Sequence, residues 1–170
     1  MTFGRFLFTY YFFVSIMMTS SVTGSNDFMP KIPEKGMESV KIAIDRFNIK
    51  IPENVTLIYY NPNNKEDRAV TLARIDGARH VYVTDMAFTS WGMLGATLLH
   101  ELEVHCVQDM YFVWDKSMDK HTKKSIIASY EREAYNYEIS NANRLGLTEK
   151  EIRSIIYTRN KLYPIGEIRK

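Results

Sequence analysis

The pattern of apolar and polar positions divides the chain after residue 36 into a helix, three strands and three more helices. Met37, Val40, Ala43, Ile44 and Phe47 recur at the spacing of one helix face, which predicts an amphipathic helix over 37–47. The segment 55–60 is β-branched and aromatic and predicts a strand. Residues 68–75 and 79–84 flank Asp76-Gly77, a strong turn dipeptide, and predict a β-hairpin.

Strict alternation marks the second arm of this hairpin. Val81 and Val83 alternate with His80, Tyr82 and Thr84, so one face of the strand is expected to be buried and the other solvated. Three strands that follow one another along the chain predict a small, mostly antiparallel sheet in meander order.

The rest of the chain is predicted to be helical. A helix over about 91–110 can be capped by Thr89 or Ser90, and Gly92 and Gly95 are expected to let it pack closely against the sheet. A charged loop over 115–124 leads to a helix over 124–145, which Gly146 ends. A capping box, Thr148 to Glu151, opens a last helix that Pro164 stops. The expected class is α+β: about three strands packed on the 91–110 helix and two further C-terminal helices.

The N-terminus has the order of a secretory signal peptide. Arg5 precedes an apolar run over 6–18, and small polar residues follow over 20–25. The run is short for a membrane span, which needs about 20 residues. The predicted organisation is therefore a cleaved signal over 1–25, a linker over 26–36 and one domain over 37–170. We expect export to the periplasm or secretion, with no stable membrane span after cleavage; the alternative is anchoring by an uncleaved segment.

Charge and cysteine content narrow the class of partner. A net charge of +2 over 170 residues provides no polybasic face for nucleic acid. Cys106 is the only cysteine, so no intramolecular disulfide can form. An exported protein without disulfides fits a bacterial envelope or secreted protein, and we interpret Cys106 as a small buried apolar residue.

Candidate chemistry is concentrated in the segment 98–105, Leu-Leu-His-Glu-Leu-Glu-Val-His. His100 and His105 are five positions apart, one more than in the His-Glu-x-x-His motif of zinc proteases. On a regular α-helix such a pair points roughly 140° apart, against roughly 40° for a pair four apart. A single π-type turn between them would bring both imidazoles to one face. A regular helix would instead pair Glu101 with His105 and His100 with Glu103.

A carboxylate on the 124–145 helix could complete a metal site. Glu133 lies on a stripe with Ile126, Tyr130, Tyr137 and Asn141, where an apolar setting would require a partner for its charge. Glu131 and Glu138 flank it. We interpret Glu131 by itself as part of a solvated acidic edge, and the pattern leaves the third ligand open among the three carboxylates.

At these residues the sequence resembles the gluzincin superfamily of zinc metallopeptidases. A His-Glu helix precedes a helix with a Glu-Ala pair, here Glu133-Ala134. The longer spacing is similar to that of dipeptidyl peptidase III-type enzymes, and the segment is also similar to small bacterial secreted domains with Gln at the position of Gln108. The resemblance covers about residues 80–140. It implies a zincin-like fold and one zinc ion on His100, His105 and Glu133, with water at the fourth position.

The resemblance also implies a reaction. Glu101 would act as general base in peptide-bond hydrolysis, and a peptide or protein substrate could pair with the strand at 80–84. Candidates for the oxyanion donor are Tyr130, Tyr135, Tyr137 and His121. Glu103 is either a partner of a ligand histidine or solvated. The alternative function is a non-catalytic metal-binding or interaction module of the bacterial envelope with a partner protein.

Overall fold

The computed structural model describes residues 30–165, so the predicted signal peptide and the first part of the predicted linker lie outside the described residues. The elements are α1 (Met37–Arg46), β1 (Val55–Tyr60), β2 (Ala69–Ala73), β3 (Arg79–Val83), η1 (Asp85–Ala87), α2 (Trp91–Leu99), η2 (His100–His105), η3 (Tyr111–Val113), α3 (Lys120–Ser140), α4 (Ala142–Leu145) and α5 (Glu149–Leu162). Within this part of the chain, no helix combines the length and the apolar character needed to cross a bilayer.

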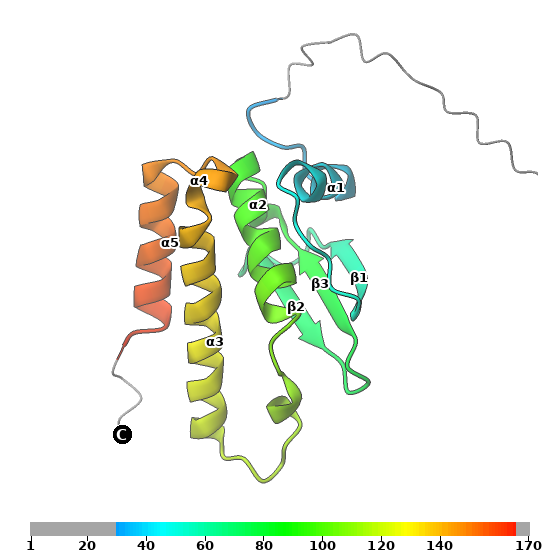
Figure 1. Ribbon diagram of the computed structural model, residues 1–170, viewed down its shortest axis with the longest axis vertical. Coiled ribbons are helices and arrows are strands. Elements are labelled where there is room, and N and C mark those ends of the chain that lie inside the picture. Colours follow the sequence, from blue (N-terminus) through cyan, green and yellow to red (C-terminus); the bar gives the residue numbers. More distant parts are fainter. Residues whose placement is uncertain (1–29, 166–170) are drawn as a thin grey trace, which may run out of the picture.

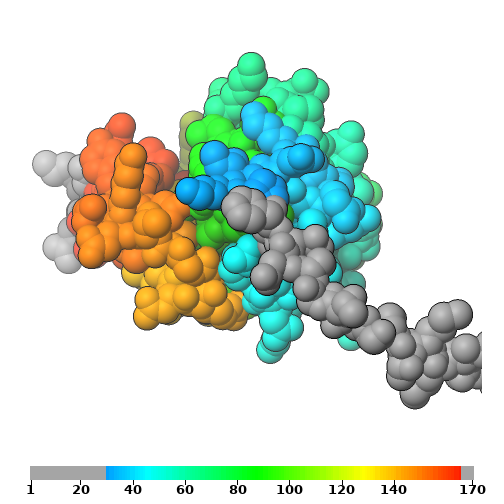
Figure 2. Space-filling view, turned by 90° about the horizontal axis from the view of Figure 1, so that it is seen from above, coloured from blue at the N-terminus to red at the C-terminus, as the bar shows by residue number. Residues whose placement is uncertain are grey.

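The architecture is α+β, with α2 as its central element. Figure 1 shows α2 between the small sheet and α3, with α1 across one end of the sheet and α5 on the outer side of α3. Seen from above, the C-terminal helices (orange to red) lie on one side of α2 and the N-terminal half (blue to teal) on the other, as Figure 2 shows. The α+β class and the three strands are as predicted.

The prediction of a mostly antiparallel meander was wrong, because the sheet is mixed. Its strand order is β1-β3-β2. β3 pairs in parallel with β1 and antiparallel with β2. The loop over 61–68 carries the chain past the position of β3, so that β2 starts at the far edge. Thr84 holds this loop in place: its backbone N–H donates to the Arg68 carbonyl at 3.0 Å, and its hydroxyl bonds the Asp67 carbonyl.

The predicted capping and turn residues end most of the helices and the hairpin. The Ser90 hydroxyl caps α2 by accepting the Met93 N–H. Thr148 and Glu151 form the capping box of α5, and Gly146 ends α4 in the left-handed conformation with φ 66°. The hairpin turns at Gly77, with φ 87°.

A continuous apolar core joins α1, the sheet and α2. Its fully buried members include Val40, Val81, Leu94, Leu98 and Leu102. The α2 glycines serve helix contacts and not, as expected, the sheet. A Cβ on Gly95 would lie 2.5 Å from the Phe47 ring of the α1 C-terminus, and one on Gly92 would lie 3.0 Å from the Leu145 carbonyl of α4.

Candidate metal centre

The helix that carries the two histidines changes its winding at the first of them. α2 ends at Leu99, and His100–His105 form one π-helical turn, with the Cys106 N–H donating to the Glu101 carbonyl at 2.9 Å. This wider turn confirms the predicted bulge and brings both imidazoles to one face. The His100 and His105 Nε2 atoms lie 3.0 Å apart, and both side chains are buried.

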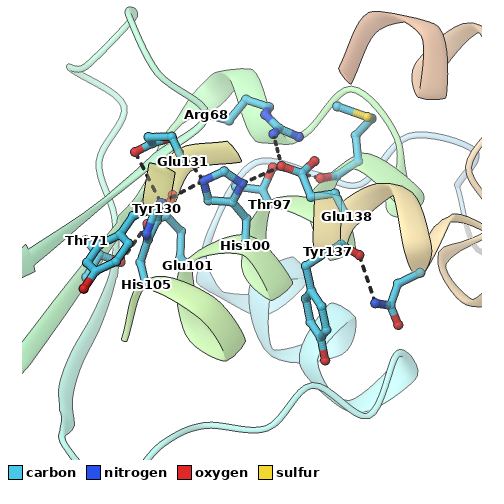
Figure 3. A network of polar contacts seen from close by, with 12 residues as sticks. Arg68, Thr71, Thr97, His100, Glu101, His105, Tyr130, Glu131, Tyr137 and Glu138 are labelled. Carbon is cyan, nitrogen blue, oxygen red and sulfur yellow. Dashed lines mark hydrogen bonds and ion pairs between the residues drawn. The ribbon is translucent and has the colours of Figure 1, made fainter. Parts of the chain in front are cut away.

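Glu131 of α3 completes a group of three side chains around one point. Its carboxylate oxygens lie 3.3 Å from His105 Nε2 and 3.6 Å from His100 Nε2. One atom from each of the three side chains lies within 4.8 Å of the others, close enough to share a metal ion. Figure 3 shows Glu131 facing both rings from the neighbouring helix.

Glu133, the carboxylate that the resemblance placed on the metal, does not face this point. It is exposed, and its Oε2 accepts a hydrogen bond from Gln108 Nε2 at 2.8 Å. The inward stripe of α3 instead runs through Glu131, Ala134, Tyr135 and Glu138. The geometry therefore favours Glu131, one of the two flanking alternatives, as the third ligand.

Each histidine is held by its other ring nitrogen. His100 Nδ1 lies 2.5 Å from Glu138 Oε1, and His105 Nδ1 lies 2.7 Å from Gln108 Oε1. An acceptor at Nδ1 fixes the proton there and leaves the Nε2 lone pair directed at the shared point. Glu138 is fully buried and also accepts from Arg68 Nη2 at 2.6 Å (Figure 3).

Charge coupling in the metal-free centre is strong. Burial alone would lower the pKa of His100, but the hydrogen bonds to Glu131 and Glu138 outweigh it and raise that pKa to about 9. Burial opposes ionisation of Glu131 as well, yet its contacts with both histidines lower its pKa to about 2. Without metal, the centre thus holds protonated imidazole groups paired with carboxylates. A bound cation would displace the imidazole protons.

Comparison with known proteins adds no relative: no protein family matches the sequence, and neither the curated proteins nor the solved structures include a significant match. The chemistry of the centre is therefore argued from its own residues.

Glu101 lies beside the three candidate ligands without joining them. It is buried, and its Oε2 accepts a hydrogen bond from the Thr71 hydroxyl of β2 at 2.7 Å. Glu101, His100, His105 and Glu131 all line a cavity of about 260 Å³, which we call the metal cavity. A carboxylate in this position can exchange a proton with a molecule in the cavity.

The other predicted candidates have different positions. Of the oxyanion donors proposed, Tyr135 lines the metal cavity, whereas the Tyr130 hydroxyl donates to the Asp109 carbonyl and the Tyr137 hydroxyl to Glu103. His121 is exposed in the first turn of α3.

Within the described residues Glu103 has no hydrogen bond or ion pair with either histidine, and it is only partly exposed, with protein partners of its own. It accepts the Lys50 N–H at 2.9 Å and the Tyr137 hydroxyl at 2.9 Å, and pairs with Arg144 at 3.5 Å. Cys106 is fully buried, as expected, and burial raises the pKa of its thiol to about 11.

The sequence named Glu138 only as an alternative third ligand, although it follows Glu131 by seven positions and so lies on the same helix face. Three further residues of the centre were not found from the sequence. Arg68, directly before β2, and Thr71, within it, precede the motif by about thirty residues, and no spacing rule connects them to it. Tyr163 lines the metal cavity from beyond the end of α5, where the sequence shows only a helix stop.

Proposed function

We propose that the protein is a zinc-dependent hydrolase, exported from the cell, that cleaves peptide bonds with Glu101 as general base. The observation that carries the proposal is the convergence of two imidazole nitrogens and one carboxylate oxygen on one point beside a second, separate carboxylate. Export rests on the N-terminal apolar run, and the zincin-like character rests on the resemblance of residues 80–140 to gluzincins.

Zinc fits the three side chains. Zinc bonds of about 2.0–2.2 Å in a tetrahedron place neighbouring ligand atoms roughly 3.3–3.6 Å apart. The separations here are 3.0, 3.3 and 3.6 Å, so small side-chain shifts would suffice. Two His and one Glu also form a known set for catalytic zinc, because three protein ligands leave one position open.

The chain's own groups would supply the remaining chemistry. When bound, zinc polarises a carbonyl and lowers the pKa of water to about 7. The Thr71 hydroxyl holds one oxygen of Glu101, which orients the carboxylate to take the water's proton and pass it to the leaving amine. Burial raises the pKa of Tyr135 to about 12, so its phenol keeps its proton and can donate to a developing oxyanion.

The sheet offers a place for an extended peptide, although not at the strand first expected. The segment 80–84 lies in the central strand, whose two edges are both paired. β2 is an edge strand, and within the described residues its outer edge has no partner strand. Arg68, Ala69, Val70 and Thr71 line the metal cavity, so a peptide added along β2 would pass in front of the ligands.

The deciding experiment compares wild type with E101Q and H100A. Zinc content is measured by elemental analysis, and hydrolysis with a mixture of unrelated peptides read by mass spectrometry. We expect about one zinc per chain in wild type and in E101Q, a loss of hydrolysis of about 10²–10⁴-fold in E101Q, and loss of both zinc and hydrolysis in H100A.

Two outcomes would count against the proposal. If the purified protein holds no zinc and cannot be loaded with it, the metal centre is refuted. If zinc binds and stabilises the fold, but wild type and E101Q are equally inactive on every peptide, the alternative of a non-catalytic metal-binding module is favoured.

A further inference from the structure

A second cavity adjoins the metal cavity. It has a volume of about 550 Å³, and we call it the side cavity. Asp67, Arg68, Tyr135 and Leu162 line both cavities, so the two share a wall and form a continuous recess. A molecule with one group at the metal has room there for a neighbouring group.

Apolar side chains line much of the side cavity. Met86, Met93, Ile155 and Leu162 contribute to its lining, and Ile155 is only 2% exposed. Methionine and leucine side chains contact an aliphatic stem favourably and adapt to its shape. The side cavity is therefore suited to a long, mostly aliphatic substituent.

The charges around this lining are unbalanced. Arg68 is neutralised by Glu138 at 2.6 Å. Glu151 accepts hydrogen bonds from Ser90 and Thr148 and so keeps its negative charge. Lys150 is the one other cation that lines the side cavity, in the part of the chain that the structure describes.

Two exposed carboxylates on the wall of the side cavity lack a counter-ion. The side chains of Glu66 and Asp67 have no hydrogen bond or ion pair with any other residue of 30–165. Asp67 also lines the metal cavity, and partial desolvation of its carboxyl group, followed by the charges of Glu66 and Glu131, raises its pKa. A cation placed between these carboxylates would relieve their repulsion.

From the cavity and its charge we infer that the side cavity is a specificity site for a substrate side chain that carries a cation on an aliphatic stem, as in lysine or arginine. The stem would lie against the apolar lining, and the cation would meet Asp67 and Glu66 next to the metal. This inference rests on the proposed function, since it treats the metal cavity as the place of reaction.

The test uses zinc-loaded full-length protein and four phosphinic peptides, which bind zinc without being cleaved. The peptides carry lysine or its uncharged counterpart norleucine, on one side or the other of the phosphinate. Calorimetry gives each dissociation constant. On one side we expect lysine to bind about three- to tenfold more tightly than norleucine, with the preference lost in 0.5 M salt.

Variants test whether Asp67 and Glu66 cause the preference for lysine. D67N should reduce it by at least half and E66Q by less, whereas K150Q, which removes a positive charge from the same lining, should keep it. Zinc content and circular dichroism of each variant show that the centre and the fold are intact. Because Glu66 is an exposed carboxylate on the same wall, E66Q provides an answer even if D67N does not fold.

The outcomes separate this inference from the proposed function. Equal binding of lysine and norleucine on both sides, or a preference that D67N and E66Q leave unchanged, would overturn the specificity site and leave the metal centre standing. Failure of zinc-loaded protein to bind any of the four peptides would count against both.

Discussion

His100 and His105 face each other with their Nε2 atoms 3.0 Å apart, although five positions separate them in the chain. The π-helical turn over 100–105 makes this possible, because a wider turn reduces the angle between residues five positions apart. The turn is held from outside by Glu103, whose carboxylate bonds the Lys50 N–H and the Tyr137 hydroxyl. The irregular winding is thus stabilised by contacts on the side away from the metal cavity.

Glu131 and Glu133 provide a direct test of the ligand set. Glu131→Gln should weaken zinc binding by about 100-fold or more, because it removes a charged ligand. Glu133→Gln should change it less than tenfold, because Glu133 acts only through Gln108 and His105. Competition with a chelating dye gives both affinities, and a greater loss in E133Q than in E131Q would reverse the assignment.

Glu138 is expected to serve both zinc binding and stability. Glu138→Gln should weaken zinc binding by about 10–100-fold, because His100 loses its charged acceptor. It should also lower the free energy of unfolding by about 3 kcal/mol, because Arg68 is left largely buried without its counter-ion. Adding Arg68→Met should recover stability in urea denaturation but not zinc affinity. Recovery of both would mean that Glu138 acts only through packing.

Stability of the metal-free protein should depend on pH through His100. Its folded pKa of about 9 lies above the usual 6.5, so its proton stabilises the fold fully below pH 6.5, and the effect is lost as the pH rises through 9. The free energy of unfolding should fall over this window by on the order of 3 kcal/mol. Glu131, with a lowered pKa of about 2, contributes stability above pH 4.5 that is lost as the pH falls toward 2.

Zinc should oppose the loss of stability between pH 6.5 and 9. Because zinc replaces the imidazole protons, its apparent affinity should rise between pH 6.5 and 9. Urea denaturation with and without zinc at several pH values measures both effects. A metal-free stability that does not change from pH 6.5 to 9 would show that His100 is not protonated in the folded state.

Gly95 should tolerate no side chain. Gly95→Ala would place a Cβ 2.5 Å from the Phe47 ring and should lower the free energy of unfolding by about 1–3 kcal/mol. Because the clash is with one ring, Phe47→Leu in the same chain should cost less than the two single changes added together. Additive losses would place the strain elsewhere.

Thr71 is expected to act on the reaction and not on the metal. Thr71→Val removes the hydroxyl that holds Glu101 and should lower kcat/KM about tenfold with zinc content unchanged. Thr71→Ser restores the hydroxyl and should restore activity. If T71S is as impaired as T71V, the methyl group and its packing are responsible.

The sequence predicts the elements of this fold better than their arrangement. Strand patterns and the Asp76-Gly77 turn define the hairpin, but the order of strands depends on whether β1 pairs with β2 or β3, and periodicity is the same in both cases. The mixed order follows from contacts of the 61–68 loop with Thr84, which lie outside any local pattern.

The residues of the candidate site were also easier to predict than their arrangement. His100, Glu101 and His105 lie within one motif, and helix phase predicted that both histidines could share an ion only with a π turn between them, which the structure has. The choice between Glu133 and the face shared by Glu131 and Glu138 depended on the rotation of α3, because two positions turn a helical side chain by about 200°. The buried Ala134, Tyr135 and Glu138 set that rotation through contacts that a single sequence does not reveal.

The last turn of α5 has a consequence for the order in which the centre forms. Leu162 and Tyr163 wall the metal cavity, and the Arg132 guanidinium donates to the Tyr163 carbonyl. At ordinary rates of translation, the stretch from Glu131 to Tyr163 takes roughly two to six seconds to synthesise. The candidate ligands are therefore synthesised before the residues that enclose them. Docking of the C-terminal segment onto Arg132 would then be the step that completes the wall of the metal cavity.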